Sequence, residues 1–235
     1  MRRSNPSAWW LMRLFAAPAG HRRFCLVYAC FRWADDIVDA PGRAADHVRP
    51  FVERQRERVG DAVEPQEGLA RRCLEIALSE CPALGAAVSG MWDALSWDAH
   101  RGSEPHARAE IEAQIGRIGD AYARGLIASL ECEATPAIFE AARAATGVHQ
   151  VRDVWIDRDL GYCNVPAEDL AGIEWAKATG GDLAPWVKAR CGAMIIALDH
   201  AAAGLGGVRP LRAWVVLRLY IWKYRRLALA LMGPA

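Results

Sequence analysis

Hydrophobic and polar positions seldom alternate along the chain, so the sequence carries almost no strand signal. Ala, Leu, Arg and Glu dominate, whereas Val, Ile and Thr rarely alternate with polar residues, and such a composition favours helix. A proline inside a helix costs about 3 kcal/mol, so prolines tend to mark helix ends or first turns. The stretches between prolines predict helices at about residues 19–40, 43–60, 66–80, 83–100, 106–131, 136–158, 167–178, 185–204 and 210–231.

Two local signals refine this pattern. Thr135-Pro136 is typical of an N-cap followed by proline at the first helical position, and residues 204–207 (GLGG) are typical of a helix end. The chain has 235 residues, 53% of them hydrophobic, with no internal repeat and no long linker. These features predict one all-α domain over residues 1–235 with a substantial core.

Charge and targeting signals narrow the classes of partner. The formal net charge is +1, so the chain lacks the broad basic field of a nucleic-acid-binding protein. Seven cysteines without C-x-x-C spacing indicate reduced thiols in a cytoplasmic protein. Arg13 interrupts the apolar run 9–12 after the basic start, which argues against a signal peptide, and no apolar run is long enough to predict a spanning helix.

The basic and aromatic segment 218–226 (RLYIWKYRR) allows two interpretations. A helix of this composition can lie on a membrane surface, which would make the protein membrane-associated. The more ordinary interpretation, which we favour, is a C-terminal core helix with one solvated face.

The first candidate for chemistry is segment 32–39 (RWADDIVD). Asp35 and Asp39 are four residues apart and share one face of a helix, with Asp36 beside them. Apolar neighbours predict partial burial, and buried like charges need a counter-charge, which a hard divalent cation supplies. The alternative is a solvated last helical turn, where the helix dipole disfavours aspartate.

The second candidate is segment 149–159 (HQVRDVWIDRD), in which His149, Asp153 and Asp157 recur every four residues. Arg152 lies beside this stripe, so the segment can hold Mg²⁺ and a diphosphate together. The alternative is a helix face of ion pairs, Asp153 with Arg152 or Asp157 with Arg158.

Aspartate stripes on two separate helices are more specific than either alone, because a helical bundle can point both into one cavity. Magnesium keeps few protein ligands and takes substrate phosphate oxygens for the rest. The pattern therefore predicts a diphosphate substrate whose leaving group the metal neutralises. The remaining carbocation needs a dry, aromatic-walled cavity, to which some of the ten tryptophans can contribute while most pack the core.

These segments resemble the phytoene/squalene synthase family. Residues 28–39 (YACFRWADDIVD) are similar to its first aspartate-rich motif, Y-A-F-C-R-x-A-D-D-I-V-D, and residues 152–157 (RDVWID) with Val165-Pro166 are similar to its second. Met91 with Trp97-Asp98 resembles the intervening G-M-x-M-D-L segment. The resemblance implies an all-α isoprenoid-synthase bundle with a central cavity. It also implies ionisation of an allylic prenyl diphosphate, followed by capture of the cation.

The resemblance assigns roles residue by residue. The metal ligands for Mg²⁺ would be Asp35, Asp36, Asp39, Asp153 and Asp157. The substrate-binding residues would be Tyr28, Arg32, Asp98, Arg152 and Tyr220. The catalytic residues would be Asp35 and Asp153. His149 is a third catalytic candidate, which rests on its own chemistry and not on the resemblance.

The departures from the family pattern bear on the acceptor. His149 stands where the family has a metal-binding Asn, Ile156 where it has Glu, and Tyr162 where it has a basic residue. Imidazole is a poor ligand for Mg²⁺, but its ordinary pKa of about 6.5 suits a general base. Alternatively, His149 is an ordinary residue on a helix face that is hydrogen-bonded to a neighbour.

The sequence leaves the acceptor open among several hypotheses. The tryptophan content and the chain's short ends favour transfer to a small molecule, an electron-rich aromatic one. The alternative is head-to-head condensation of two prenyl diphosphates. Terpene cyclisation and an inactive family member are further possibilities, although the retained aspartates argue against the last.

Overall fold

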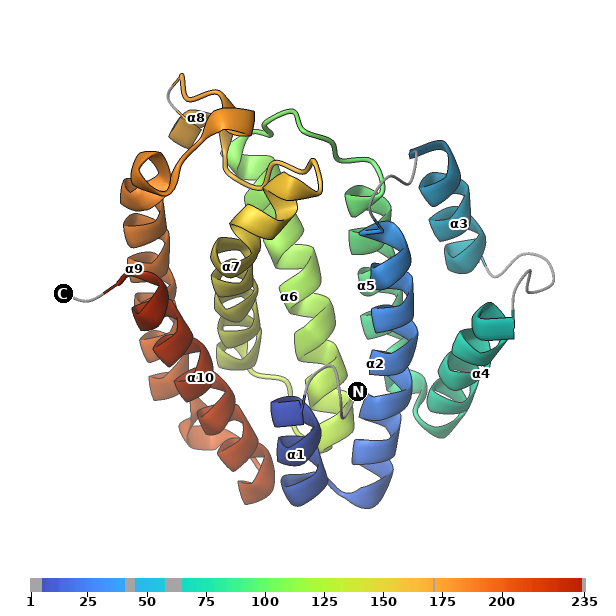
Figure 1. The fold of residues 1–235 in the computed structure, drawn as a ribbon. Coiled ribbons are helices and arrows are strands. Elements are labelled where there is room, and N and C mark those ends of the chain that lie inside the picture. Colours follow the sequence, from blue (N-terminus) through green and yellow to red (C-terminus); the bar gives the residue numbers. More distant parts are fainter. Residues whose placement is uncertain (1–5, 41–44, 58–64, 171, 234–235) are drawn as a thin grey trace. The chain divides into compact units, whose positions relative to one another are not determined.

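The computed structural model describes residues 6–40, 45–57, 65–170 and 172–233, and these fold as helices joined by short connections, with no strand among them (Figure 1). The all-α prediction is therefore confirmed. The α-helices are α1 (Pro6–Phe15), α2 (Pro18–Val38), α3 (Ala45–Glu57), α4 (Pro65–Glu80), α5 (Gly85–Asp98), α6 (Arg108–Leu130), α7 (Pro136–Asp159), α8 (Ala167–Leu170), α9 (Gly180–Gly204) and α10 (Leu211–Leu231). The 3-10 turns are η1 (Pro82–Leu84), η2 (Trp175–Lys177) and η3 (Leu205–Gly207).

Most predicted helices are present, and the differences have local causes. The predicted helix 167–178 is instead α8 and η2, because Gly172 lies between them with φ +86°, a backbone conformation that favours glycine. Helix α9 begins at Gly180 and carries Pro185 in its interior, since Thr179 and Asp182 form a capping box that fixes the earlier start.

Two further local predictions can be compared with the structure. Pro136 opens α7 with Thr135 at the N-cap, although the Thr135 side chain makes no capping hydrogen bond. Helix α9 ends at Gly204, as the glycine-rich stretch indicated. Helix α1 was not predicted; it begins at Pro6, which suits a first helical turn.

The chain forms two compact units, each built from separate stretches of sequence. Unit 1 comprises Met1–His100, Asp120–Ala134 and Val208–Val216, and unit 2 comprises Arg101–Gly119, Thr135–Gly207 and Leu217–Ala235. Helices α6 and α10 each contribute to both units. The single domain and the central cavity expected from the sequence stay predictions.

Unit 1 buries one face of α2 against α4 and α5, while α3 packs on α5. Phe31 of α2 meets Trp92 of α5 with ring centroids 5.1 Å apart, and Trp33 meets Phe51 of α3 at 5.3 Å. Between these aromatic contacts, Ala34 is fully buried. The packing fixes the rotation of α2 and so the direction in which its aspartate-rich turn points.

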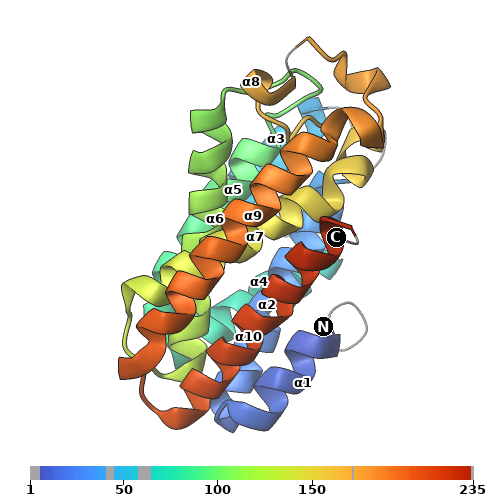
Figure 2. The ribbon, with the colours of Figure 1, turned by 90° about the vertical axis from the view of Figure 1, so that its left-hand side faces the viewer.

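Unit 2 is built on the long contact between α7 and α9 (Figures 1 and 2). Small side chains on α7 let the two helices approach closely: a Cβ added at Gly147 would lie 2.5 Å from the Met194 sulfur. The buried residues of this α7 face include Ala137, Ala141, Ala144, Ala145 and Val148. The other side of α7 is left for the polar residues of the second motif.

Gly119 is a second point of close approach in unit 2. A Cβ added there would lie 2.7 Å from the Arg143 Cα and 2.8 Å from its backbone nitrogen, whereas Gly116, one turn earlier on α6, has nothing within 4 Å. We expect Gly119→Ala to lower the free energy of unfolding by about 1–3 kcal/mol, because backbone must shift. Gly116→Ala is the matched control and should raise it by about 0.5–1 kcal/mol. Chemical denaturation of both variants tests this, and equal stability would contradict the close contact.

The helices, the cysteines and the tryptophans can each be compared with what the sequence predicted. Among the described helices, none combines the length and the apolar character needed to cross a membrane. All seven cysteines lie in the part of the chain that the structure describes, and none of them forms a disulfide. Trp92, Trp175 and Trp186 are buried, while Trp10 and Trp222 are exposed by 49% and 56%.

Candidate functional site

The first aspartate-rich motif occupies the last turns of α2. Arg32 donates a hydrogen bond from Nη1 to Asp35 Oδ2 at 3.1 Å and a second one from Nη2 to Asp36. The Asp35 side chain is 41% exposed and that of Asp36 57% exposed. Asp39 caps the helix, with its backbone N–H bonded to the Asp35 carbonyl. Arg32 therefore bridges the two neighbouring carboxylates of the motif.

Asp35 is in an unfavourable electrostatic environment for a carboxylate. Burial raises its pKa to about 7, and repulsion from Asp39, Asp98 and Asp36 adds to this against the opposing attraction of Arg32. Asp98 ends α5, so the structure brings this residue, expected from the sequence to bind substrate, to the first motif. Proximity of several carboxylates with one guanidinium leaves excess negative charge.

This charge arrangement fits a magnesium ion that arrives with its substrate. Within the described ranges, no group of three or more His, Cys, Asp or Glu side chains is placed to hold a metal ion by itself. Magnesium, however, is usually bound by one or two carboxylates, with phosphate oxygens and water as the other ligands. Asp35 and Asp39 have the right chemistry for that role, and the excess charge is what a divalent cation offsets.

Tyr28 lies one turn before Arg32 on α2, half-buried. Its ring stacks with Phe24 at a centroid distance of 6.5 Å, and its hydroxyl is close enough to act electrostatically on Arg32. The structure thus places Tyr28 and Arg32, both expected to contact diphosphate, on the same side of α2 as Asp35.

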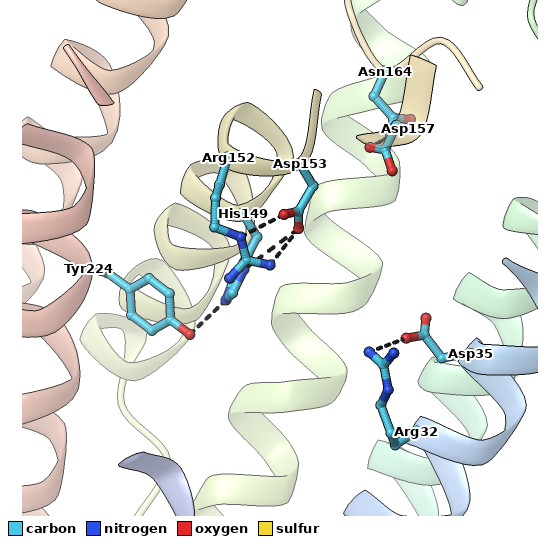
Figure 3. A network of polar contacts seen from close by, with 8 residues as sticks. All are labelled: Arg32, Asp35, His149, Arg152, Asp153, Asp157, Asn164 and Tyr224. Atoms are coloured by element: carbon cyan, nitrogen blue, oxygen red, sulfur yellow. Dashed lines mark hydrogen bonds and ion pairs between the residues drawn. The ribbon is translucent and has the colours of Figure 1, made fainter. Parts of the chain in front are cut away.

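The second motif lies on α7, where Arg152 binds Asp153 through two parallel hydrogen bonds of 2.6 and 2.5 Å (Figure 3). The Asp153–Arg152 ion pair that the sequence allowed is present, and the role of Asp153 in holding Mg²⁺ stays a prediction. The Asp153 side chain is 28% exposed and that of Arg152 44% exposed. A bidentate guanidinium of this kind also matches phosphate oxygens, so Arg152 can exchange one anion for another.

Asp157 does not pair with Arg158, which instead binds Asp159. Its Oδ2 accepts a hydrogen bond of 2.5 Å from Asn164 Nδ2 (Figure 3). The Asn164 side-chain oxygen accepts in turn from Arg101 Nη1 at 2.6 Å. The loop after α7 therefore helps to hold the Asp157 carboxylate in place.

His149 pairs with Tyr224 of α10, a residue the site prediction missed. The His149 Nε2 lies 2.7 Å from the Tyr224 hydroxyl, and the His149 Nδ1 lies 4.0 Å from Asp153 Oδ2 (Figure 3). We assign the ring proton to Nδ1, facing the Asp153 charge, so that Nε2 accepts from the Tyr224 O–H. Tyr220, the expected substrate contact, packs on Tyr224 with centroids 4.7 Å apart.

The pKa of His149 differs from the ordinary value that the sequence argument used. Burial lowers it to about 4, helped by the positive charges of Arg152 and Lys223 and opposed by Asp153. The imidazole is therefore neutral at pH 7. It is a weaker base than the sequence suggested.

This lowered pKa predicts a pH dependence of stability. Between about pH 6.5 and 4 the unfolded chain binds a proton at His149 that the folded protein does not, so stability falls as the pH drops through this range. His149→Gln should remove that part of the fall, and Tyr224→Phe should cost about 1 kcal/mol through the lost hydrogen bond. Thermal melts from pH 7 to 4 test both; identical pH profiles for His149→Gln and the native chain would contradict the lowered pKa.

Within each unit, the structure thus gathers the residues singled out from the sequence. Unit 1 holds Tyr28, Arg32, Asp35, Asp36, Asp39 and Asp98, and unit 2 holds His149, Arg152, Asp153, Asp157 and Tyr220. Three polar partners were not predicted from the sequence: Asn164 in the loop after α7, and Arg101 and Tyr224 from distant segments. Only Tyr224 had a usable signal, its position one turn after Tyr220.

The similarity of this chain to known proteins lies in its structure. No family model matches the chain, and no curated protein matches it in sequence. The solved structure of squalene synthase HpnC from Alicyclobacillus acidocaldarius is similar over 97% of this chain and 89% of its own, with a TM-score of 0.72 and 17% identity. A dehydrosqualene synthase in complex with ligand is similar over 96% of this chain and 81% of its own, with a TM-score of 0.71 and 16% identity. The chain has the all-α fold of these synthases, as the resemblance implied.

Proposed function

We propose that this chain is a prenyltransferase that ionises an allylic prenyl diphosphate and joins two prenyl groups head to head. The structural neighbours bear the names squalene synthase and dehydrosqualene synthase. They favour this reaction, which the sequence left as the alternative, over transfer to an aromatic acceptor, which the sequence favoured.

The observation that carries the proposal is the gathering of Asp36, Asp39 and Asp98 around Asp35, with Arg32 bonded to two of these carboxylates. A pKa raised to about 7 by burial and by Asp39 and Asp98 marks a carboxylate held where its negative charge is costly. A purely structural ion pair with Arg32 would not need this excess of acid. The arrangement makes sense when a cation and a diphosphate complete it.

Each side chain then has a role at the diphosphate. Asp35 and Asp39 would hold Mg²⁺ at the first motif, and Asp153 and Asp157 would hold Mg²⁺ at the second. When bound, the metal neutralises charge on the departing diphosphate. Arg32 and Arg152, which pair with aspartates in this structure, would bind diphosphate oxygens if those carboxylates held the metal.

The His149–Tyr224 pair is suited to orientation rather than to metal binding. The Nε2 of His149 is already engaged by the Tyr224 hydroxyl, and the neutral ring adds no charge. We propose that the pair fixes the position of Asp153 through the facing Nδ1.

The test is diphosphate release with Mg²⁺ from allylic diphosphates of increasing chain length, each given alone, with products followed by mass spectrometry. A hydrocarbon of doubled carbon number is expected. Release without a coupled product would favour a missing acceptor, a cyclic monomeric hydrocarbon would indicate cyclisation, and no release from any substrate would contradict the proposal.

A further inference from the structure

The second half of α10 exposes several large apolar side chains that do not pack into the core. Leu219, Trp222 and Leu229 are exposed by 40%, 56% and 43%. Their spacing of three and seven residues places them on one side of the helix. The opposite side of α10 is buried, and its core residues are Leu217, Tyr220, Ile221, Tyr224 and Ala228.

The same face is strongly basic. Arg218 and Arg226 are exposed on it, and residues 211–231 contain no Asp or Glu. The Arg226 guanidinium lies 5.2 Å from the centre of the Trp222 ring, so charge and aromatic surface are presented together. This concentration of positive charge stands out in a chain whose formal net charge is +1.

Helix α9 extends this surface. Arg225 donates a hydrogen bond to Asp199 at 2.8 Å, and Arg218 donates to the Ala202 carbonyl at 3.2 Å, which fixes α9 beside α10 (Figure 2). Ile196, one turn before Asp199, is 72% exposed. We call the residues Ile196, Arg218, Leu219, Trp222, Arg226 and Leu229 the basic-aromatic face.

We propose that the basic-aromatic face docks the protein on the surface of an anionic lipid bilayer, with α10 lying in the plane of the interface. Tryptophan and leucine side chains partition into the boundary between headgroups and acyl chains, and arginines bind the phosphates above it. The basic-aromatic face combines both kinds of residue, as a helix that binds an anionic bilayer does.

The positive charge of the basic-aromatic face favours an anionic bilayer over a second copy of the chain as its partner. A symmetric dimer through this face would bring two arginine-bearing surfaces together, and like charges across an interface are costly. An anionic bilayer neutralises them instead. The inference uses residues of unit 2 that have no part in the diphosphate chemistry, so it does not rest on the proposed function.

The test is co-sedimentation of the full chain with vesicles of phosphatidylcholine containing phosphatidylglycerol, compared with phosphatidylcholine alone. We expect binding to the anionic vesicles that weakens with added salt, and weak binding to the neutral ones. Trp222→Glu should lower the partition coefficient at least about tenfold, and Arg218→Gln with Arg226→Gln about fivefold per arginine. The matched control is Leu69→Glu, which places the same charge at another exposed leucine, 67% exposed on α4, and should bind as the native chain does.

Three results would overturn the proposal. The first is equal vesicle binding by Trp222→Glu and the native chain, with circular dichroism melts showing that both are folded. The second is binding that is indifferent to the anionic lipid. The third is a native dimer in light scattering that Trp222→Glu converts to monomer, which would assign the face to self-association.

Discussion

Replacing Asp35 with Asn is expected to lower Mg²⁺-dependent diphosphate release by about 10²–10³-fold, the usual cost of losing one group that stabilises transition-state charge. The amide keeps the size of the carboxyl group but removes the charge that would bind the metal. A discontinuous assay for released diphosphate on the purified variant measures the effect.

The same variant should be more stable than the native chain at pH 8. The Asp35 pKa is about 7 in the folded protein, against 3.8 for an unperturbed aspartate. The folded state therefore keeps a proton between about pH 4 and 7 that the unfolded chain has released, and the free energy of unfolding falls as the pH rises through this range. An asparagine at position 35 does not titrate, so the variant does not lose this part of the free energy of unfolding. Because the side chain is 41% exposed, solvent screening reduces the gain to about 1 kcal/mol.

Asp93→Asn is the matched control for Asp35→Asn. Asp93 lies in the same unit, is 40% exposed and pairs with Arg56 at 2.7 Å. Its loss removes an ordinary exposed ion pair and should leave diphosphate release unchanged. Equal activity in Asp35→Asn and Asp93→Asn would contradict the role of the first motif.

Replacing Asp153 with Asn is the second change with a large expected effect. Diphosphate release should again fall by about 10²–10³-fold, while stability changes by less than about 1 kcal/mol, because Arg152 is 44% exposed and can turn to water. The pKa of His149 should fall further, since the Asp153 charge is what raises it. Activity assays and an NMR titration of His149 measure the two effects.

Asp159→Asn provides the control on the same helix. Arg158 binds Asp159 as Arg152 binds Asp153, with residues adjacent in sequence, but the Asp159 side chain is 70% exposed. We expect this variant to keep native activity. Were Asp153→Asn as active as Asp159→Asn, the second motif would be a surface ion pair and nothing more.

The helices and the first motif could be predicted because their signals are local. Helical composition, prolines at helix starts and the four-residue spacing of Asp35 and Asp39 are all properties of neighbouring residues. The predicted start of α9 at residue 185 was wrong. The capping box of Thr179 and Asp182 starts the helix at Gly180, so that Pro185 lies inside it.

The second motif was only partly predictable because its side chains find partners from distant segments. His149 meets Tyr224, which lies 75 residues away in sequence, and Asn164 joins Asp157 to Arg101, which lies 63 residues from Asn164. Helical periodicity places a residue on a face but does not say which helix packs against that face. The lowered pKa of His149 follows from the same distant packing, so the ordinary value was a poor guide.

The measurement that tests the central claim most directly is a mixed-label incubation. The chain is given Mg²⁺ and an equal mixture of unlabelled and fully deuterated allylic diphosphate, and the products are weighed by mass spectrometry. Head-to-head condensation predicts a doubled hydrocarbon that includes a species carrying one labelled and one unlabelled half. Products that are each wholly labelled or wholly unlabelled in their prenyl part, with no mixed species, would contradict the account.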